Sequence, residues 1–259
     1  MIKNKTISLV IPCKNEEKII GATIKRVPSY VDEIIVVDNG STDNSAQAAR
    51  EAGAIVVTEN RKMNGVGYGY AHIAGIKKAT GDYIFAMDAD DTYPSYQIGA
   101  IAHFMDDNDL DVVSCNRLPL YNKKAINPTR RLGIYILNLE VTLLYRTKMR
   151  DILTGMWAIN RRALPKLNLR MGDWNLSPEI KVSAITNKDI KFSEYHIDHF
   201  IREQEPSKQA IWNTGTSHLL YILKRRFTED SRLGGLVYQI LNRNWKRPAF
   251  AGQKSFFTL

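Results

Sequence analysis

GDYIFAMDADDTYP, residues 81–94, joins a short apolar run to a cluster of carboxylates. The run YIFAM is continuous rather than alternating, as expected of a parallel strand that is covered on both faces. Asp88, Asp90 and Asp91 follow it within four positions. Because these like charges repel one another, the stretch predicts a buried strand whose carboxyl end needs a counter-charge.

The chain on both sides of this stretch alternates β-branched runs with helical patterns. Continuous apolar runs predict strands at 7–13, 33–38, 54–59, 82–88 and 111–116. Apolar residues at helical spacing, with capping residues at several ends, predict helices at 16–27, 42–52, 66–79 and 95–106. Strands that alternate with helices in this way indicate a doubly wound α/β sheet.

Polar residues follow four of the predicted strands. These strands end in PCKNEE, DNGSTD, DADD and NR, in chain order. In open α/β sheets, ligands bind in the crevice outside the carboxyl ends of the strands. The sequence therefore predicts a polar crevice that is built from four separate loops.

The acids of DADD suit a hard cation. Asp88 and Asp90 can converge on one ion from a turn, and all-oxygen ligation favours Mg²⁺ or Mn²⁺. No His/Cys cluster lies nearby, which argues against zinc. Two alternatives stay open: a solvated acidic turn that caps the next helix, and a phosphatase motif, DxDxT, in which Asp88 is the nucleophile.

The overall composition is that of a soluble globular protein. The chain has 259 residues, of which 44% are hydrophobic and 24% charged. No window approaches the roughly 18 apolar residues of a spanning helix, and the N-terminal apolar stretch is too short for a secretory signal. Cys13 and Cys115 are too few for a disulfide framework. We expect a cytoplasmic protein with one large α/β domain.

The positive charge is concentrated near the C-terminus. From residue 206 onward, nine Lys/Arg stand against two acidic residues, whereas the whole chain has a net charge of +9. The stretches 211–227 and 233–247 are amphipathic as well as basic, and 131–146 also has helical apolar spacing. We expect a domain at 1–205 and a basic segment at 206–259, which lies on an anionic membrane surface or packs on the domain. No nucleic-acid-binding pattern is present.

Five motifs occur in an order and spacing that resemble a known family. They are IPCKNEE, EIIVVDNGSTD, NGVGYGYAHIAG, MDADDTYP and DILTGMW. Together they are similar to the family 2 glycosyltransferases with the GT-A fold, and most of all to the dolichol-phosphate mannosyltransferase group. The resemblance covers about residues 5–210. It implies a Rossmann-like, mostly parallel sheet flanked by helices, with a C-terminal amphipathic helical appendage, and sugar transfer from a nucleotide donor to a polyprenyl phosphate.

The resemblance also implies roles on the donor side. Asn39 stands where the family usually has a second acid, so the resemblance leaves open whether the donor is a UDP- or a GDP-sugar. Asp88 and Asp90 match the pair that binds the metal and the diphosphate, and Asp90 is also a candidate catalytic residue. The implied nucleotide-sugar-binding residues are Pro12, Lys14, Glu16, Asp38, Asn39, Gly67, Asp88 and Asp90.

On the acceptor side, the resemblance implies cations for a phosphate. Asp151 matches an acid that orients the acceptor or acts as a base, although a helix-capping role is also open. Thr154 and Trp157 depart from the family pattern, and Trp157 replaces an arginine. The implied acceptor-phosphate-binding residues are Arg117, Arg202, Ser207 and Lys208.

These expectations describe an inverting, metal-dependent glycosyltransferase, peripheral on the cytoplasmic face of the membrane. Two other functions remain open at this point. The same fold could act on a sugar or protein hydroxyl, with Asp151 as the base, or it could be a non-catalytic scaffold at the membrane. The sequence does not predict the transferred sugar or an oligomeric state.

Overall fold

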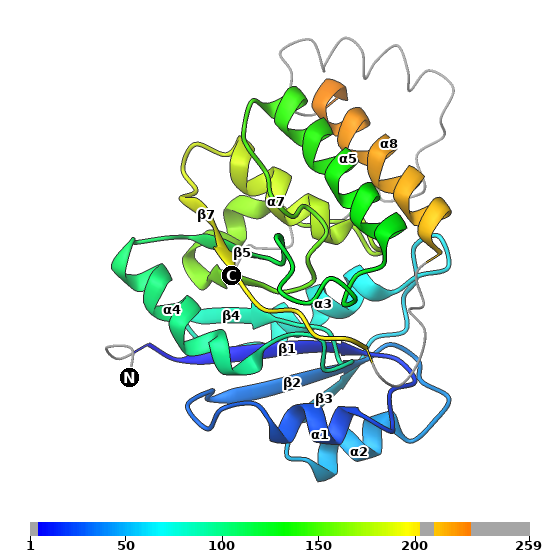
Figure 1. The fold of residues 1–259 in the computed structure, drawn as a ribbon. Helices are drawn as coiled ribbons and strands as arrows, with labels where there is room; N and C mark the ends of the chain where they lie inside the picture. The colour runs from blue at the N-terminus through cyan, green and yellow to red at the C-terminus, as the bar shows by residue number, and fades with distance from the viewer. Residues whose placement is uncertain (1–4, 203–209, 229–259) are drawn as a thin grey trace, which may run out of the picture.

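A single sheet of seven strands forms the centre of the described part of the protein. The computed structural model describes residues 5–202 and 210–228. The strands are β1 (Ile7–Cys13), β2 (Glu33–Asp38), β3 (Ile55–Thr58), β4 (Tyr83–Ala86), β5 (Val112–Asn116), β6 (Trp157–Asn160) and β7 (Phe192–His196). Their order across the sheet is β3-β2-β1-β4-β6-β5-β7 (Figure 1).

The sheet is mostly parallel, which confirms the predicted fold class. β1 pairs in parallel with β2 and β4, β2 with β3, and β5 with β7. The exception is β6, which lies between β4 and β5 and is antiparallel to both. The predicted strands are present within two residues at each end, whereas β6 was not predicted, because four residues carry too little pattern to be recognised.

Helices cover both faces of the sheet (Figure 1). One apolar layer packs α1, α2 and α4 on the sheet, and the other packs α3, α6 and α7. The helices are α1 (Ile20–Lys25), α2 (Ser45–Glu51), α3 (Tyr68–Lys78), α4 (Ile98–Asp107), α5 (Pro128–Tyr145), α6 (Leu164–Leu167), α7 (Leu176–Thr186) and α8 (Ile211–Thr228), with 3₁₀ turns at Ser95–Gln97 and Arg161–Ala163.

The first two helices begin later than predicted, because the loops before them bond to each other. The Asn15 carboxamide accepts a hydrogen bond from the Thr42 backbone N–H, at 2.8 Å. The Glu16 backbone N–H donates to Ser45 Oγ, at 2.7 Å. Side chains that would otherwise cap a helix thus join the loop after β1 to the loop after β2. The joined loops form one rim of the crevice at the carboxyl ends of these strands.

α5 and α8 lie side by side above the sheet (Figure 1). Leu137 and Val141 of α5 pack against Ile222 of α8, and the Tyr145 hydroxyl donates to the Ile222 carbonyl at 3.2 Å. The helix predicted at 211–227 therefore packs on the rest of the protein, while the stretch 233–247 lies outside the described residues. The division at 205/206 stays a prediction. In the described part of the chain, no helix is both long and apolar enough to cross a bilayer.

Candidate functional site

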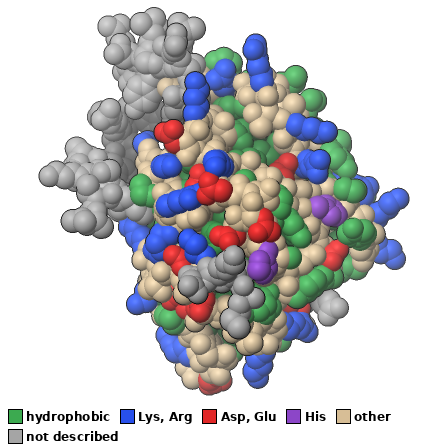
Figure 2. Space-filling model, turned by 90° about the vertical axis from the view of Figure 1, so that its left-hand side faces the viewer, with side chains coloured by type: hydrophobic (Ala, Val, Ile, Leu, Met, Phe, Trp, Pro, Cys, Tyr) green, Lys and Arg blue, Asp and Glu red, His purple; other side chains and the backbone are tan. Residues whose placement is uncertain are grey.

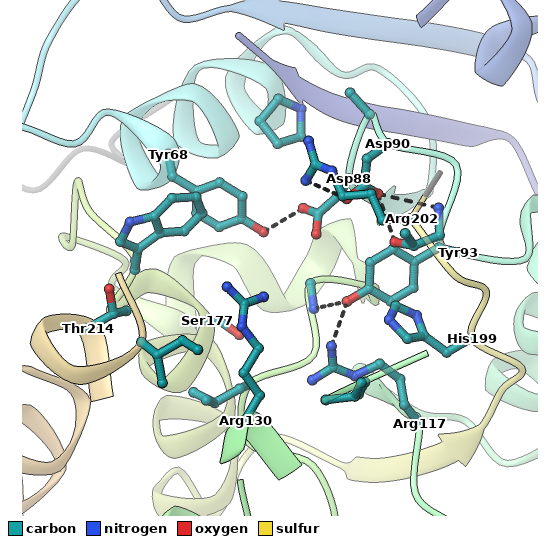
Figure 3. A pocket seen from close by; sticks show the side chains of 18 of the residues that line it. Tyr68, Asp88, Asp90, Tyr93, Arg117, Arg130, Ser177, His199, Arg202 and Thr214 are labelled. Carbon is teal, nitrogen blue, oxygen red and sulfur yellow. Dashed lines mark hydrogen bonds and ion pairs between the residues drawn. The ribbon is translucent and has the colours of Figure 1, made fainter. Parts of the chain in front are cut away.

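The carboxyl ends of the central strands open into a cavity of about 1090 Å³. Its walls come from the loop after β1, the first turn of α3, the loop after β4, and the first halves of α5 and α8 (Figure 3). Asp38 and Asp151 do not line it, and Ser207 and Lys208 lie outside the described residues. The other predicted site residues all line it: Pro12, Lys14, Glu16, Asn39, Gly67, Asp88, Asp90, Arg117 and Arg202.

Asp88 lies at the floor of the cavity, just beyond the end of β4. The Tyr68 hydroxyl, from the first turn of α3, donates a hydrogen bond to Asp88 Oδ1 at 2.9 Å. Burial and the neighbouring charge of Asp90 raise the pKa of the Asp88 carboxyl above its ordinary value. Burial beside Asp88 also raises the pKa of Tyr68, so its hydroxyl stays a donor. Ionising both Asp88 and Asp90 is therefore unfavourable, because their negative charges repel each other in a buried place.

Arg202 supplies the counter-charge that the DADD sequence requires. Its Nη1 donates to Asp90 Oδ2 and its Nη2 to Glu16 Oε1, each at 2.9 Å. Asp91 points elsewhere and pairs with Arg26 at the surface. Arg202, which the sequence placed on the acceptor phosphate, thus lies among the acids of the predicted donor side.

The two acids fit a Mg²⁺ or Mn²⁺ ion that also binds phosphates. Within the described residues, no group of three His, Cys, Asp or Glu side chains is placed to hold a metal. Asp88 and Asp90 alone would leave most of the coordination shell to other oxygens. Mg²⁺ commonly binds in this manner, through one or two carboxylates with water and substrate phosphates.

Asn39 and Gly67 form a tightly packed corner of the cavity. The Asn39 side-chain amide donates to the Glu59 carbonyl, which fixes its orientation. A Cβ on Gly67 would lie only 2.2 Å from Asn39 Oδ1 and 2.6 Å from the Arg61 carbonyl oxygen, so only glycine fits. Asp38 instead accepts a hydrogen bond from the Ser41 backbone N–H and stabilises the turn after β2. The structure thus keeps Asn39 in the cavity and directs Asp38 away from it.

Asp151 is fully buried behind the cavity and holds Arg117. Arg117 Nε donates to Asp151 Oδ2 at 2.7 Å, and Nη2 donates to Oδ1 at 3.0 Å. Although burial opposes ionisation, the charge and hydrogen bonds of Arg117 hold the pKa of Asp151 below its ordinary value. A carboxylate engaged in this way is poorly placed to remove a proton from a ligand. The geometry favours a structural role, which the sequence left open beside the catalytic one.

Arg130 lines the cavity but was not singled out from the sequence. It lies in the first turn of α5, where the Asn127 side chain caps the helix by accepting from the Arg130 backbone N–H at 2.8 Å. Arg117, Arg130 and Arg202 all line the cavity, and burial together with the charges of the other two lowers the pKa of Arg130. The sequence did contain a signal for this position. Asn127-Pro128 before a helical pattern marks a helix start, and Arg130 follows in the first turn.

The cavity therefore has two electrostatic sides (Figure 3). Asp88 and Asp90 lie on an acidic side, where Arg202 joins Asp90 to Glu16, and Arg117 and Arg130 lie on the opposite side. The outer surface shows no such separation in one view, since basic and acidic side chains are mixed there (Figure 2). An arrangement of this kind can hold a cation with a bound diphosphate at one end and a second anion at the other.

Comparison with known proteins now assigns the family. The profile described as Glycosyl transferase family 2 matches residues 8–167. The chain belongs to glycosyltransferase family 2. This match confirms the resemblance carried by the five motifs and the enzyme class that they predict. It leaves the phosphatase interpretation of DADDT without support.

Several named proteins are similar to this chain. The low-salt glycan biosynthesis hexosyltransferase Agl6 of Haloferax volcanii is 27% identical over 84% of the chain, which spans only 53% of that protein. An uncharacterised glycosyltransferase of Mycobacterium bovis is 30% identical over 63% of the chain and 71% of its own length. An undecaprenyl-phosphate 4-deoxy-4-formamido-L-arabinose transferase of Aeromonas hydrophila is 37% identical, but over 36% of the chain and 32% of its own length.

A solved structure shares the fold. Glucosyl-3-phosphoglycerate synthase from Mycobacterium tuberculosis, in complex with Mn²⁺, UDP and phosphoglyceric acid, superposes with a TM-score of 0.65. The superposition covers 86% of this chain and 78% of that one, at 19% identity. At this identity the likeness supports the GT-A fold alone.

Proposed function

We propose that the protein transfers a sugar from a nucleoside-diphosphate sugar to a polyprenyl phosphate, with inversion at the sugar and with a divalent metal. The observation that carries this proposal is the two-sided cavity, in which Asp88 and Asp90 face Arg117 and Arg130. The relative named as an undecaprenyl-phosphate transferase and the fold relative with bound UDP and Mn²⁺ support it.

On the donor side, the residues of the chain hold and orient the diphosphate. Asp88 and Asp90 would bind Mg²⁺ or Mn²⁺, which neutralises the charge that grows on the leaving diphosphate. The Tyr68 hydroxyl fixes one oxygen of Asp88. Arg202 already lies beside Asp90 and can transfer a hydrogen bond to an arriving phosphate oxygen. The buried amide of Asn39 is available to an edge of the base.

On the acceptor side, a phosphate needs no protein base. A phosphate monoester is anionic at pH 7, so its oxygen can attack without first losing a proton to the protein. The carboxylates among the described lining residues are Glu16, Asp88 and Asp90, and all lie on the acidic side. Arg117 and Arg130 would bind the acceptor phosphate, while Asp151 keeps Arg117 in place. A hydroxyl acceptor would need Asp151 as a base, which its burial disfavours.

The acceptor's apolar chain matches the helices beside the cavity. α5 and α8 each line the cavity with one face and expose large apolar side chains on another. Leu143 is 71% exposed and Trp212 is 77% exposed. We therefore propose that this helix pair, with the basic residues of α8, lies on the anionic cytoplasmic face of a membrane. The exposed set is Leu132, Tyr135, Ile136, Leu139 and Leu143 of α5, and Trp212, Leu219, Leu220, Leu223 and Phe227 of α8.

A donor panel tests the transfer reaction. UDP- and GDP-sugars are incubated with Mn²⁺ and a short polyprenyl phosphate, and lipid-linked sugar is measured. We expect product with one donor and loss of at least a hundredfold in Asp90→Asn. Asp151→Asn leaves Arg117 without its carboxylate, so it should raise the KM for polyprenyl phosphate more than it lowers kcat, with the pH dependence of kcat unchanged. Transfer to a sugar or protein hydroxyl instead of the lipid, with a pH-dependent loss of kcat in Asp151→Asn, would support the alternative acceptor.

Flotation with vesicles tests the membrane surface. The full chain should float with vesicles of anionic lipid, and the double variant Leu143→Ser/Trp212→Ser should not. The control, Tyr30→Ser, removes an aromatic side chain that is 44% exposed before β2 and should float like the wild type. Equal flotation of all three proteins would reject the helix pair as the membrane-binding surface.

A further inference from the structure

Lys181 is a fully buried lysine that none of the roles above uses. It lies in α7, and its Nζ donates to the Thr154 carbonyl oxygen and to Ser177 Oγ, each at 2.7 Å. Within the described residues, no carboxylate oxygen comes within 4.0 Å of this ammonium group. Burial lowers the pKa of Lys181 to about 7, although the negative charge of Asp151 acts to raise it. An ammonium buried without an ion pair is costly, so its position calls for a reason other than stability.

Lys181 holds one end of a peptide group whose other end faces the cavity. The Thr154 carbonyl and the Gly155 N–H belong to the same planar unit. The carbonyl accepts from Lys181 and, at 2.9 Å, from Ser177 Oγ. The Gly155 N–H donates to the Tyr93 hydroxyl at 2.7 Å. The peptide plane is thus fixed from both sides, with its positive end toward the site.

This peptide is in close contact with the residues that form both sides of the cavity. A Cβ on Gly155 would lie 2.8 Å from Asp88 Oδ2, so the backbone forms a wall directly behind that carboxylate. The Tyr93 hydroxyl that receives the Gly155 N–H also lies 3.5 Å from Arg117 Nη1. If the peptide rotated by half a turn, its electron-rich carbonyl would replace the N–H that faces the Tyr93 hydroxyl, beside Asp88. That orientation would add negative potential where an anionic diphosphate has to bind.

We propose that Lys181 is a positioning residue, which keeps the Thr154–Gly155 peptide oriented with its N–H toward the cavity. In this way it sets the positions of Asp88 and Tyr93 for the anionic ligand. Lys181 touches neither donor nor acceptor in this arrangement. Its effect passes through the Gly155 N–H and the Tyr93 hydroxyl that accepts from it. This role rests on the proposed function, because it concerns binding of the same nucleotide.

The variant Lys181→Met tests this role, because it keeps the length of the side chain and removes the ammonium. The Thr154 carbonyl keeps the Ser177 hydroxyl as a donor, and no carboxylate loses an ion-pair partner, so the melting temperature should stay close to that of the wild type. Amide exchange at Gly155 should accelerate at least tenfold, measured by hydrogen–deuterium exchange on the full chain. Exchange in the strands should not change. Faster exchange throughout the sheet with a lower melting temperature would mean a purely structural role and would overturn the proposal.

Nucleotide binding supplies the second readout. We expect Lys181→Met and Tyr93→Phe each to weaken binding of UDP or GDP with Mn²⁺ by about tenfold in calorimetry, or 1.4 kcal/mol. Because both act through the same peptide, the double variant should lose about tenfold and not a hundredfold. Ser183→Ala, which removes another buried polar group of α7, should bind as the wild type does. Additive losses, or wild-type binding in Lys181→Met, would reject the role.

The two readouts separate this inference from the proposed function. If the wild type binds no nucleoside diphosphate, the proposed donor is wrong, and the exchange rate at Gly155 still decides whether Lys181 orients the peptide. If the wild type binds and the exchange rate at Gly155 is the same in Lys181→Met, the proposed function stands and the positioning role is rejected.

Discussion

Replacing Arg202 with methionine should destabilise the protein in a way that a metal ion can reverse. The guanidinium donates two 2.9 Å hydrogen bonds, and its side chain is only 20% exposed, while those of Glu16 and Asp90 are 10% and 13% exposed. Charge-assisted hydrogen bonds contribute about 1.5–3 kcal/mol each, and the loss would leave two carboxylates facing each other beside Asp88. We expect Arg202→Met to lower the free energy of unfolding by about 3 kcal/mol.

Thermal unfolding in EDTA and in Mn²⁺, without nucleotide, measures both effects. For a domain of this size, about 3 kcal/mol corresponds to a melting temperature lower by about 6–12 °C. Mn²⁺ at a hundred times its dissociation constant should restore about 2.7 kcal/mol to Arg202→Met, because the ion can take the place of the guanidinium beside Asp90. The wild type should respond less, since Arg202 competes with the ion there.

Arg26 provides the matched control. It also pairs with an acid of the DADD cluster, Asp91, but these side chains are 58% and 30% exposed. A surface pair of this kind contributes about 0–1 kcal/mol, so Arg26→Met should melt close to the wild type with and without Mn²⁺. If Arg202→Met melted like Arg26→Met, or if Mn²⁺ stabilised all three proteins equally, Arg202 would not be the counter-charge of the site.

Other substitutions test separate parts of the structure. Gly67→Ala should weaken UDP or GDP binding at least tenfold in calorimetry, because its Cβ would displace Asn39; unchanged affinity would mean that this corner is empty of ligand. Burial raises the pKa of Glu140 from 4.5 to about 7. Between pH 4.5 and 7 the folded protein therefore keeps a proton that the unfolded chain loses, and the free energy of unfolding falls as the pH rises through this range. In urea unfolding at pH 8, Glu140→Gln should therefore have a free energy of unfolding about 1–2 kcal/mol above that of the wild type, a figure reduced for solvent screening. The difference should be smaller at pH 5, and an equal difference at both pH values would exclude ionisation as the cause. Gly215 lines the cavity, and a Cβ there would meet open space, so Gly215→Leu should have a melting temperature no lower than that of the wild type. Its rate of transfer to polyprenyl phosphate should fall at least tenfold, while its affinity for the nucleotide should not change.

The sequence predicted the elements whose signal is local. Continuous apolar runs identified five strands, and the polar residues after them identified the crevice, because parallel strands bring their carboxyl ends to one edge. Gly67 and Asn39 were implied by the resemblance to the family, and both line the cavity. The strands and the crevice depend on residues close together in the chain, so periodicity and the polar strand ends were sufficient to predict them.

What the sequence could not predict depends on contacts between distant residues. Arg202 pairs with Glu16 across 186 positions, and no local pattern indicates that partner. β6 is recognisable only through its pairing with β4 and β5. Lys181 would be expected on a solvated helix face, yet the packing of α7 buries it completely. In each case the tertiary structure, and not the intrinsic preference of the segment, decides the environment.

The antiparallel course of β6 has a consequence for how such proteins can diversify. The chain leaves the sheet after Asn116 of β5 and returns at Trp157 of β6, which pairs antiparallel with β5. Residues 117–156 therefore form a connection that begins and ends at the carboxyl end of β5. The middle of this segment, residues 118–150, can be exchanged for another without rethreading the strands that precede Asp88 and Asn39, and without removing the Thr154–Gly155 peptide. A chimera that receives this middle part and α8, which packs on α5, from a relative should change its acceptor while keeping its nucleotide.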